Sequence, residues 1–371
     1  MTLMHNKVPV VAIDAMGGDF APYETVKGGI IAALELKAEI ILVGNVDSIL
    51  EVIKEKIQKE LGLTFIVSDI NEDEKTLVVK KGGTTSSITM IHAPDEVSME
   101  EKNPARAVKR AANSSIVVSN KLVASGRADA VIAAGNTGAA TAASLFELKR
   151  IEGFERPAIC TIIPTTTGKM LLIDGGSNIE TTPEQMVQSA IIGTLFYKLI
   201  FKKDKAKIGL LNIGEEDGKG TELYKTAFTL LKAEPRINFI GNVEGKTIID
   251  GSLCDVAICD GFTGNIHLKA LEGGLKMMSS AIQNHIKGGG PIALIGGLLL
   301  KSVNVFGKLK DHFHPNSFGG ALLGGLNGIS IISHGSSNYE AIVNACKRAI
   351  TFTEEDLINK LKEEIAVEAA I

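Results

Sequence analysis

Loops of small and polar residues recur along the chain, each between a short apolar run and a segment with helical periodicity. They are rich in Gly, Asn, Asp, Ser and Thr, and they follow residues 8–13, 130–134, 171–173, 208–213, 256–258 and 329–332. In a parallel sheet the carboxyl ends of the strands share one edge, and the helix after each strand directs free N–H groups toward it. The pattern therefore predicts a binding site for an anion, with phosphate as the foremost candidate.

The loop after residues 130–134 has the residue types that an anion site requires. Asn136, Thr137 and Gly138 open the following helix, where small residues admit a ligand and N–H groups face it. An ordinary capped turn uses the same residues, with Asn136 or Thr137 as the cap. One such loop is weak evidence for a ligand, but several at one edge of a sheet favour a shared site.

Three aspartates, Asp14, Asp174 and Asp260, lie beside glycines at the ends of predicted strands. Carboxylates in this arrangement can bind a divalent metal or accept hydrogen bonds from the N–H groups of their own loops. We favour the second interpretation, so no metal site is predicted.

Lys219 lies between two glycines at the start of a helical pattern, and it is the best-placed cation for an anionic ligand. An ordinary surface lysine has the same sequence surroundings. His334 precedes a Ser-rich helix start, where it can either cap the helix or take part in catalysis. The chain has no Gly-x-Ser-x-Gly motif and no Gly-x-Gly-x-x-Gly motif after the first strand, which disfavours a covalent acyl-enzyme and a dinucleotide site respectively.

An alternating α/β framework is expected to position these loops. Strands and helices alternate over residues 8–13, 23–36, 40–43 and 46–61, and further helices are expected over residues 103–124, 183–197 and 220–233. At the C-terminal end, Thr353 is expected to cap a last helix with Leu357, Leu361 and Ile365 on its apolar face.

Composition and charge disfavour several protein classes. Of the 371 residues, 45% are hydrophobic and 22% charged, which is enough apolar material for one large core or two lobes. The net charge of −4 argues against general nucleic-acid binding. The four cysteines lack Cys-x-x-Cys spacing, and residues 1–7 are too short and polar for a signal peptide. We therefore expect a cytoplasmic globular protein with reduced thiols.

One stretch departs from the alternation. Consecutive glycines and Pro291 interrupt the chain, and residues 292–300 are then strongly apolar and flanked by lysines. The run is too short to span a bilayer, which takes about 20 apolar residues. It can form a buried helix, pack against its copy in a dimer, or lie on an anionic membrane surface.

Taken together, the loops resemble those of the bacterial phosphate acyltransferases, the acyl-acyl carrier protein:phosphate acyltransferases of phospholipid synthesis. The resemblance spans nearly the whole chain. The motifs that carry it lie, in order, at residues 13–19, 134–139, 156–158, 212–216, 219–220, 259–265, 319–324 and 333–335.

The resemblance implies a three-layer α/β/α fold with a mostly parallel sheet, like that of the isocitrate and isopropylmalate dehydrogenases, with a protruding apolar helical segment. It implies an acyltransferase domain over residues 8–352, followed by a C-terminal helix over residues 353–371. Within the domain, residues 270–312 are expected to supply dimer and membrane contacts, among them Ile292, Leu294, Leu298 and Leu299.

The activity implied by the resemblance is transfer of a long-chain fatty acyl group from acyl carrier protein to inorganic phosphate. The product, acyl phosphate, is used in phosphatidic acid synthesis, and neither a metal nor an organic cofactor is required. The implied partners are acylated carrier protein, a second copy of the chain, an anionic membrane surface and a downstream membrane glycerol-phosphate acyltransferase. The protein is thus expected in the cytoplasm, peripherally attached to the membrane.

By match to the family motifs, Lys219 neutralises phosphate or the charge that develops on it, and Asn265 donates a hydrogen bond to phosphate or to the carbonyl oxygen. The remaining residues expected to bind substrate are small and polar members of the same loops. They are Asp14, Gly17, Gly18, Asn136, Thr137, Gly138, Asp174, Asn178, Asp260, Gly261, Gly264, His334, Gly335 and Ser336.

The sequence leaves three alternatives open. The first is a coenzyme A-dependent phosphate acyltransferase acting on short chains, which carrier-protein dependence would distinguish. The second, on fold analogy alone, is a nicotinamide-dependent decarboxylating dehydrogenase. The third is a non-enzymatic membrane scaffold that binds acyl carrier protein.

Overall fold

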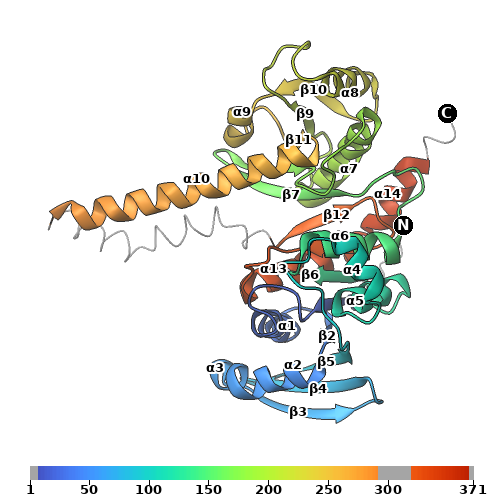
Figure 1. The fold of residues 1–371 in the computed structure, drawn as a ribbon, viewed down its shortest axis with the longest axis vertical. Helices are drawn as coiled ribbons and strands as arrows, with labels where there is room; N and C mark the ends of the chain where they lie inside the picture. Colours follow the sequence, from blue (N-terminus) through green and yellow to red (C-terminus); the bar gives the residue numbers. More distant parts are fainter. Residues whose placement is uncertain (1–6, 291–318, 367–371) are drawn as a thin grey trace. The chain divides into compact units, whose positions relative to one another are not determined.

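The computed structural model describes residues 7–290 and 319–366. The chain forms two compact units, which Figure 1 shows coloured along the sequence. The first unit consists of Met1–Ile159 and Phe318–Ile371, and the second of Cys160–Ser317.

The first unit contains a sheet in the order β12-β13-β6-β1-β2-β5-β4-β3. Strands β13, β6, β1, β2 and β5 run parallel, whereas β12, β4 and β3 run antiparallel to their neighbours. The bounds are β1 Val10–Asp14, β2 Glu39–Gly44, β3 Thr64–Asp69, β4 Glu74–Lys81, β5 Thr84–His92, β6 Ala130–Ala133, β12 Ala321–Gly324 and β13 Ile329–Ile332.

Helices cover both faces of this sheet. Val10 and Ala12 belong to the same apolar cluster as Leu122 of α5, while Ile13 points to the other face, where Gly29 of α1 packs against it. A central parallel strand is therefore buried on both sides, which explains why β1 is apolar without alternation. The helices of the unit are α1 Tyr23–Glu35, α2 Val46–Val52, α3 Gln58–Leu61, α4 Pro104–Arg110, α5 Ser115–Ala124, α6 Thr137–Leu148, α13 Tyr339–Glu354 and α14 Leu357–Ala366.

The second unit contains strands in the order β10-β9-β11-β8-β7. The first four are parallel and β7 is antiparallel to β8. Gly193 of α7 packs against Val256 and Ile173 on one face, whereas Leu268 of α10 packs on the cluster of the other face. The elements are β7 Ala158–Thr165, β8 Gly168–Ile173, β9 Lys207–Leu211, β10 Asn238–Val243, β11 Val256–Ile258, α7 Pro183–Phe201, α8 Glu222–Ala233, α9 Gly245–Asp250 and α10 Gly261–Gly288.

Each unit thus has a mostly parallel sheet between two layers of helices, and the predicted α/β/α class is confirmed. Three predicted elements differ in detail. The helix expected over residues 103–124 is divided into α4 and α5, and the one over residues 46–61 contains a π-helical turn at Ile53–Ile57. Thr353 is not an N-cap: it lies in the last turn of α13, where its hydroxyl donates to the Ala349 carbonyl, and α14 begins only at Leu357.

Across the part of the chain that the structure describes, none of the helices combines the length and apolar character needed to traverse a bilayer. Helix α10 is the longest of them, with 28 residues, and its second half carries exposed apolar side chains. Met277 and Met278 are 72% and 47% exposed. Ile292, Leu294, Leu298 and Leu299 lie outside the described residues.

Candidate active site

In the first unit, the loops after β1, β6 and β13 are in backbone contact. A Cβ atom added to Gly17 would lie 2.9 Å from the backbone nitrogen of Gly135, and one added to Gly18 would lie 3.3 Å from the Gly335 oxygen. The Asp19 N–H donates to the same Gly335 oxygen at 2.8 Å. The structure therefore brings together Gly17, Gly18 and Gly335, where the close approach of three loops leaves little room for a side chain.

Asp14 ends β1 beneath this contact and is 3% exposed. Its Oδ1 accepts from the Met16 N–H at 3.2 Å, and the Ser115 hydroxyl and the Gly17 N–H also hydrogen-bond to the carboxyl group. Burial, opposed by these hydrogen bonds, raises the pKa of Asp14 from 3.8 to about 6. The geometry is that of a carboxylate that braces its own loop.

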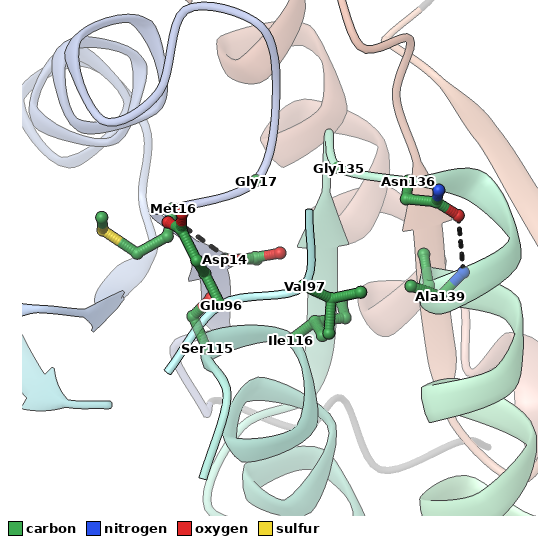
Figure 2. A pocket seen from close by; sticks show the side chains of 11 residues that line it. Asp14, Met16, Gly17, Glu96, Val97, Ser115, Ile116, Gly135, Asn136 and Ala139 are labelled. Carbon is green, nitrogen blue, oxygen red and sulfur yellow. Dashed lines mark hydrogen bonds between the residues drawn. The ribbon is translucent and has the colours of Figure 1, made fainter. Parts of the chain in front are cut away.

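A small pocket opens beside Asp14, between β1 and the start of α6 (Figure 2). Asp14, Glu96, Ser115 and Asn136 are among its lining residues. Of the described residues that line it, two carry carboxyl groups and none is Lys, Arg or His. With both carboxyl groups ionised, this pocket repels a phosphate dianion. The anion pocket expected at Gly17 and Asn136 is therefore not formed by these side chains alone.

The side chain of Asn136 caps α6. Its Oδ1 accepts from the Ala139 N–H at 3.0 Å, and its Nδ2 donates to the Met99 carbonyl at 2.9 Å. Thr137 is exposed in the first turn, and a Cβ on Gly138 would lie only 2.6 Å from Pro104. Asn136, and not Thr137, is therefore the cap of α6. A side chain at Gly138 would collide with Pro104, so the glycine allows α4 to pack on α6.

His334 is exposed in the loop after β13 and does not cap the next helix. Its Nδ1 lies 2.8 Å from Ser336 Oγ, and the Ser336 N–H approaches the same nitrogen at 3.2 Å. The cap of α13 is Asn338, whose Oδ1 accepts from the Ala341 N–H at 3.1 Å. The capping interpretation of His334 is therefore wrong.

In the second unit, Asp174 braces the loop after β8. Its Oδ1 accepts from the N–H groups of Gly176 and Ser177 at 3.0 and 2.9 Å, and its Oδ2 accepts from the Asn178 N–H at 2.8 Å. This pattern confirms the loop-bracing interpretation of the aspartate. Among the described residues, no group of three or more His, Cys, Asp and Glu side chains is arranged to hold a metal ion.

Asp260 caps α10, the helix that carries Asn265. Its Oδ1 accepts from the Thr263 N–H at 2.8 Å, and its Oδ2 accepts from the Thr263 hydroxyl at 2.9 Å. The Asp174 loop packs directly on this helix start, because a Cβ on Gly264 would lie 1.9 Å from the Asp174 carbonyl oxygen. Gly261 donates its N–H to the Asn178 carbonyl at 2.8 Å. Gly261 and Gly264 are therefore needed because a side chain at either position would collide with the Asp174 loop.

Asn265 is exposed one turn into α10, and Gly176 of the Asp174 loop approaches its side chain. A Cβ on Gly176 would lie 3.3 Å from Asn265 Cβ. A larger residue at position 176 would crowd the asparagine.

Lys219 projects from the loop between β9 and α8. Its side chain is 48% exposed, and its Nζ lies 3.8 Å from a carboxylate oxygen of Glu216, a weak surface pair. The backbone beneath it is held firmly: Asn212 Nδ2 donates to the Lys219 carbonyl at 3.1 Å, and Asn242 Nδ2 donates to the Glu216 carbonyl at 2.7 Å. The ammonium group is therefore accessible while its loop is anchored.

Lys219 and Asn265 belong to the same edge of the second unit's sheet. Strands β9, β11 and β8 are parallel neighbours, so the loops that follow them leave at one edge. Tyr224, in the first turn of α8, connects two of these loops through a 2.5 Å hydrogen bond to Asp260 Oδ2. The structure thus brings together Asp174, Asn178, Asp260 and Gly264 and places Lys219 on the adjoining loop.

Sequence reasoning missed Tyr224 and Asn242. Asn242 is a buried polar residue within strand β10, and such a residue usually has a specific hydrogen-bond partner. Tyr224 follows Gly220 by one helical turn, but its long-range partner depends on strand order, which no local pattern reports.

Comparison with known proteins identifies the family. A family model described as "Fatty acid synthesis protein" matches residues 10–69 and 56–360. A phosphate acyltransferase of Desulfitobacterium hafniense is 40% identical over 356 residues, covering 96% of this chain and 97% of that protein. A phosphate acyltransferase of Desulforamulus reducens is 41% identical over 355 residues, with 96% and 97% covered.

The chain belongs to the phosphate acyltransferase family. It is accordingly an acyltransferase enzyme, as the resemblance of its motifs predicted. A phosphotransacetylase from Streptococcus pyogenes aligns with a TM-score of 0.55 at 16% identity, over 95% of each chain. The EutD phosphotransacetylase from Staphylococcus aureus aligns with a TM-score of 0.53 at 13% identity, also over 95% of each chain. At these identities the structural similarity shows the α/β/α fold alone.

Proposed function

We propose that this phosphate acyltransferase transfers a long-chain fatty acyl group from acyl carrier protein to inorganic phosphate. The product is acyl phosphate, a precursor for phosphatidic acid. The observation that carries the proposal is that Lys219, on a braced loop, and Asn265, near the capped start of α10, belong to one sheet edge of a chain with whole-length family similarity.

The proposed reaction is direct attack of phosphate on a thioester. A phosphate oxygen forms a bond to the carbonyl carbon, the carbon–sulfur bond breaks, and the carrier leaves as a thiolate. The protein has to hold a dianion against a carbonyl group and stabilise the oxyanion that forms. The exposed ammonium of Lys219 supplies the balancing charge, and the amide of Asn265 supplies a hydrogen-bond donor, worth about 3 kcal/mol for one oxyanion contact.

The other loop residues support these two side chains. Asp260 and the Asn178 carbonyl hold the start of α10 through hydrogen bonds, and Asp174 braces the loop that packs on it. Gly261 and Gly264 allow the close contact. We assign no substrate contact to the Asn136 side chain of the first unit, because both ends of its amide are already occupied.

The direct test uses the purified protein with palmitoyl-acyl carrier protein and inorganic phosphate. We expect acyl phosphate, trapped by hydroxylamine as the hydroxamate, in amounts that depend on phosphate. Absence of a phosphate-dependent product would contradict the proposal. Turnover with a short-chain acyl-coenzyme A but not with the acylated carrier would favour the coenzyme A-dependent alternative.

We also propose that residues 270–312 mediate dimer formation and contact with an anionic membrane surface, where acyl phosphate is passed to a membrane acyltransferase. The exposed second half of α10 supports this assignment. Replacing Leu294 and Leu298 with Glu should release the protein from anionic vesicles while sparing activity on a soluble substrate. Vesicle binding equal to that of the wild type would refute the membrane role of these leucines.

A further inference from the structure

We infer that Tyr224 is a positioning residue that sets the Lys219 loop relative to the helix carrying Asn265. The inference deepens the proposed function and rests on it. Tyr224 itself does not touch the reacting atoms. It acts by linking two protein segments that hold groups for phosphate and the thioester.

One end of the link is the Lys219 loop. Gly220, with a φ of 93°, follows Lys219, and a Cβ added to it would lie 2.8 Å from Tyr224 Cβ. A Cβ at the same position would also lie 2.8 Å from Asn212 Oδ1. The loop is therefore packed between the tyrosine and the amide that holds the Lys219 carbonyl. A shift of Tyr224 would move the segment next to Lys219.

The other end of the link is the start of α10. Tyr224 Oη donates to Asp260 Oδ2 at 2.5 Å and lies 3.3 Å from the Thr263 hydroxyl. The same carboxylate caps the helix through the Thr263 N–H at 2.8 Å. The tyrosine thus bonds to the group that fixes the first turn of α10, and Asn265 follows in the next turn.

The surroundings of Tyr224 make this link rigid. The residue is 8% exposed, and burial together with the hydrogen bond to Asp260 raises the pKa of its hydroxyl. The hydroxyl therefore remains a proton donor at neutral pH. Charge-assisted hydrogen bonds of this kind are short and roughly twice as strong as neutral ones.

The same unit contains a second hydrogen-bonded tyrosine–aspartate pair, which lies at the opposite end of strand β11. Tyr197 is buried and donates to Asp255 Oδ1 at 2.7 Å, and Asp255 directly precedes β11, whereas Asp260 follows it. Asp255 also accepts from the Lys207 N–H at 2.9 Å, at the amino end of β9. Each tyrosine hydroxyl donates to a carboxylate, part-buried at Tyr197 and buried at Tyr224, where the hydroxyl also contacts Thr263. Only Tyr224 lies on the edge that carries Lys219.

The experiment compares Tyr224→Phe with Tyr197→Phe in the full-length enzyme. Both variants are expected to lower the Tm, Tyr224→Phe by at least as much as Tyr197→Phe, because its hydroxyl makes more hydrogen bonds. Only Tyr224→Phe is expected to raise the KM for phosphate, by about tenfold, the factor that corresponds to one hydrogen bond to a charged group. The KM for the acyl donor should change little. Equal phosphate KM values in the two variants would overturn the inference, because a purely structural role affects both alike.

A double-variant cycle tests whether Tyr224 acts through Lys219. In a Lys219→Ala background, Tyr224→Phe should have a smaller effect on phosphate KM than in the wild type, whereas independent effects would contradict the link. If Tyr224→Phe does not fold, Thr263→Val removes the other side-chain donor to Asp260 Oδ2 and is expected to raise phosphate KM selectively. An unchanged KM in that variant would count against the link.

Direct binding separates this inference from the proposed reaction. Calorimetric titration with inorganic phosphate needs no acyl donor, so it reports on the phosphate site even if acyl carrier protein is the wrong substrate. Weaker phosphate binding in Tyr224→Phe than in Tyr197→Phe would support the positioning role in that case. Equal binding in both would overturn it.

Discussion

The two units use the same kind of loop in different ways. In the first unit, glycines after β1, β6 and β13 place three backbones in contact, Asp14 is buried, and the Asn136 side chain is occupied as a helix cap. In the second unit, similar loops are braced by Asp174 and Asp260 but leave Lys219 and Asn265 exposed. A glycine-rich loop at a strand end therefore marks a close approach of backbones, and only the surrounding side chains decide whether it also presents chemical groups.

The sharpest test of this contrast is Lys219→Ala. If Lys219 supplies the balancing charge, kcat/KM should fall by about 100-fold or more, comparable with loss of one electrostatic contact to the transition state. The Tm should change little, because the side chain is exposed and its pair with Glu216 is long.

Lys232→Ala is the matched control. Lys232 is also exposed and pairs at 3.2 Å with Asp217 of the same loop, but it carries no proposed role in the reaction. Activity of Lys219→Ala equal to that of Lys232→Ala would remove Lys219 from the mechanism.

The second test concerns the packing beneath Asn265. Gly264→Ala places a methyl group 1.9 Å from the Asp174 carbonyl oxygen, so the loop has to move. We expect destabilisation by about 1–3 kcal/mol in urea unfolding, the range for overpacking, together with reduced activity. Gly273→Ala in the same helix meets no atom within 4 Å and should instead stabilise by about 0.5–1 kcal/mol. Equal stabilities of the two variants would show that the contact between the loops is not tight.

The third test concerns the buried acid of the first unit. Because the pKa of Asp14 is raised from 3.8 to about 6, the folded protein binds more protons than the unfolded chain between these values. This group therefore makes the free energy of unfolding fall as the pH rises from about 4 to 6, by up to about 3 kcal/mol in total. Asp14→Asn should remove that part of the pH dependence.

Urea unfolding at a series of pH values measures the effect. The Ser115 hydroxyl favours the ionised form of Asp14, so Ser115→Ala should raise the pKa of Asp14 further. The fall in the free energy of unfolding should then continue to higher pH. If the free energy of unfolding depends on pH in the same way in the wild type and in Asp14→Asn, the pKa of Asp14 is not raised.

The smallest expected effect is that of Asn136→Ala. Loss of an N-cap typically costs about 1 kcal/mol, and the hydrogen bond to the Met99 carbonyl is lost as well. If Asn136 is structural, kcat/KM per folded molecule should stay near the wild-type value. A large loss of activity without a change in stability would instead make Asn136 a substrate ligand, and the contrast between the units would fail.

Local sequence patterns predicted much of the framework. The apolar runs at β1, β6 and β8 are strands because they are buried on both faces. The sequence predicts loop bracing by Asp260 and offers Asn136 as one of two possible caps, and the structure shows Asp260 and Asn136 in these roles. The division of residues 103–124 into two helices and the end of α13 at Glu354 were not predicted, because boundaries depend on tertiary contacts as well as on propensity.

The sequence by itself determined the alternation of strands and helices, the positions of the polar loops and the family to which the chain belongs, since each depends on residues close together in the chain or on ordered motifs. Only the tertiary structure decided that the Asn136 side chain is occupied, that the pocket beside Asp14 is acidic, and that Tyr224 reaches Asp260. These contacts join residues far apart in the sequence. They depend on the order of strands in the sheet, which the packing of the whole unit selects.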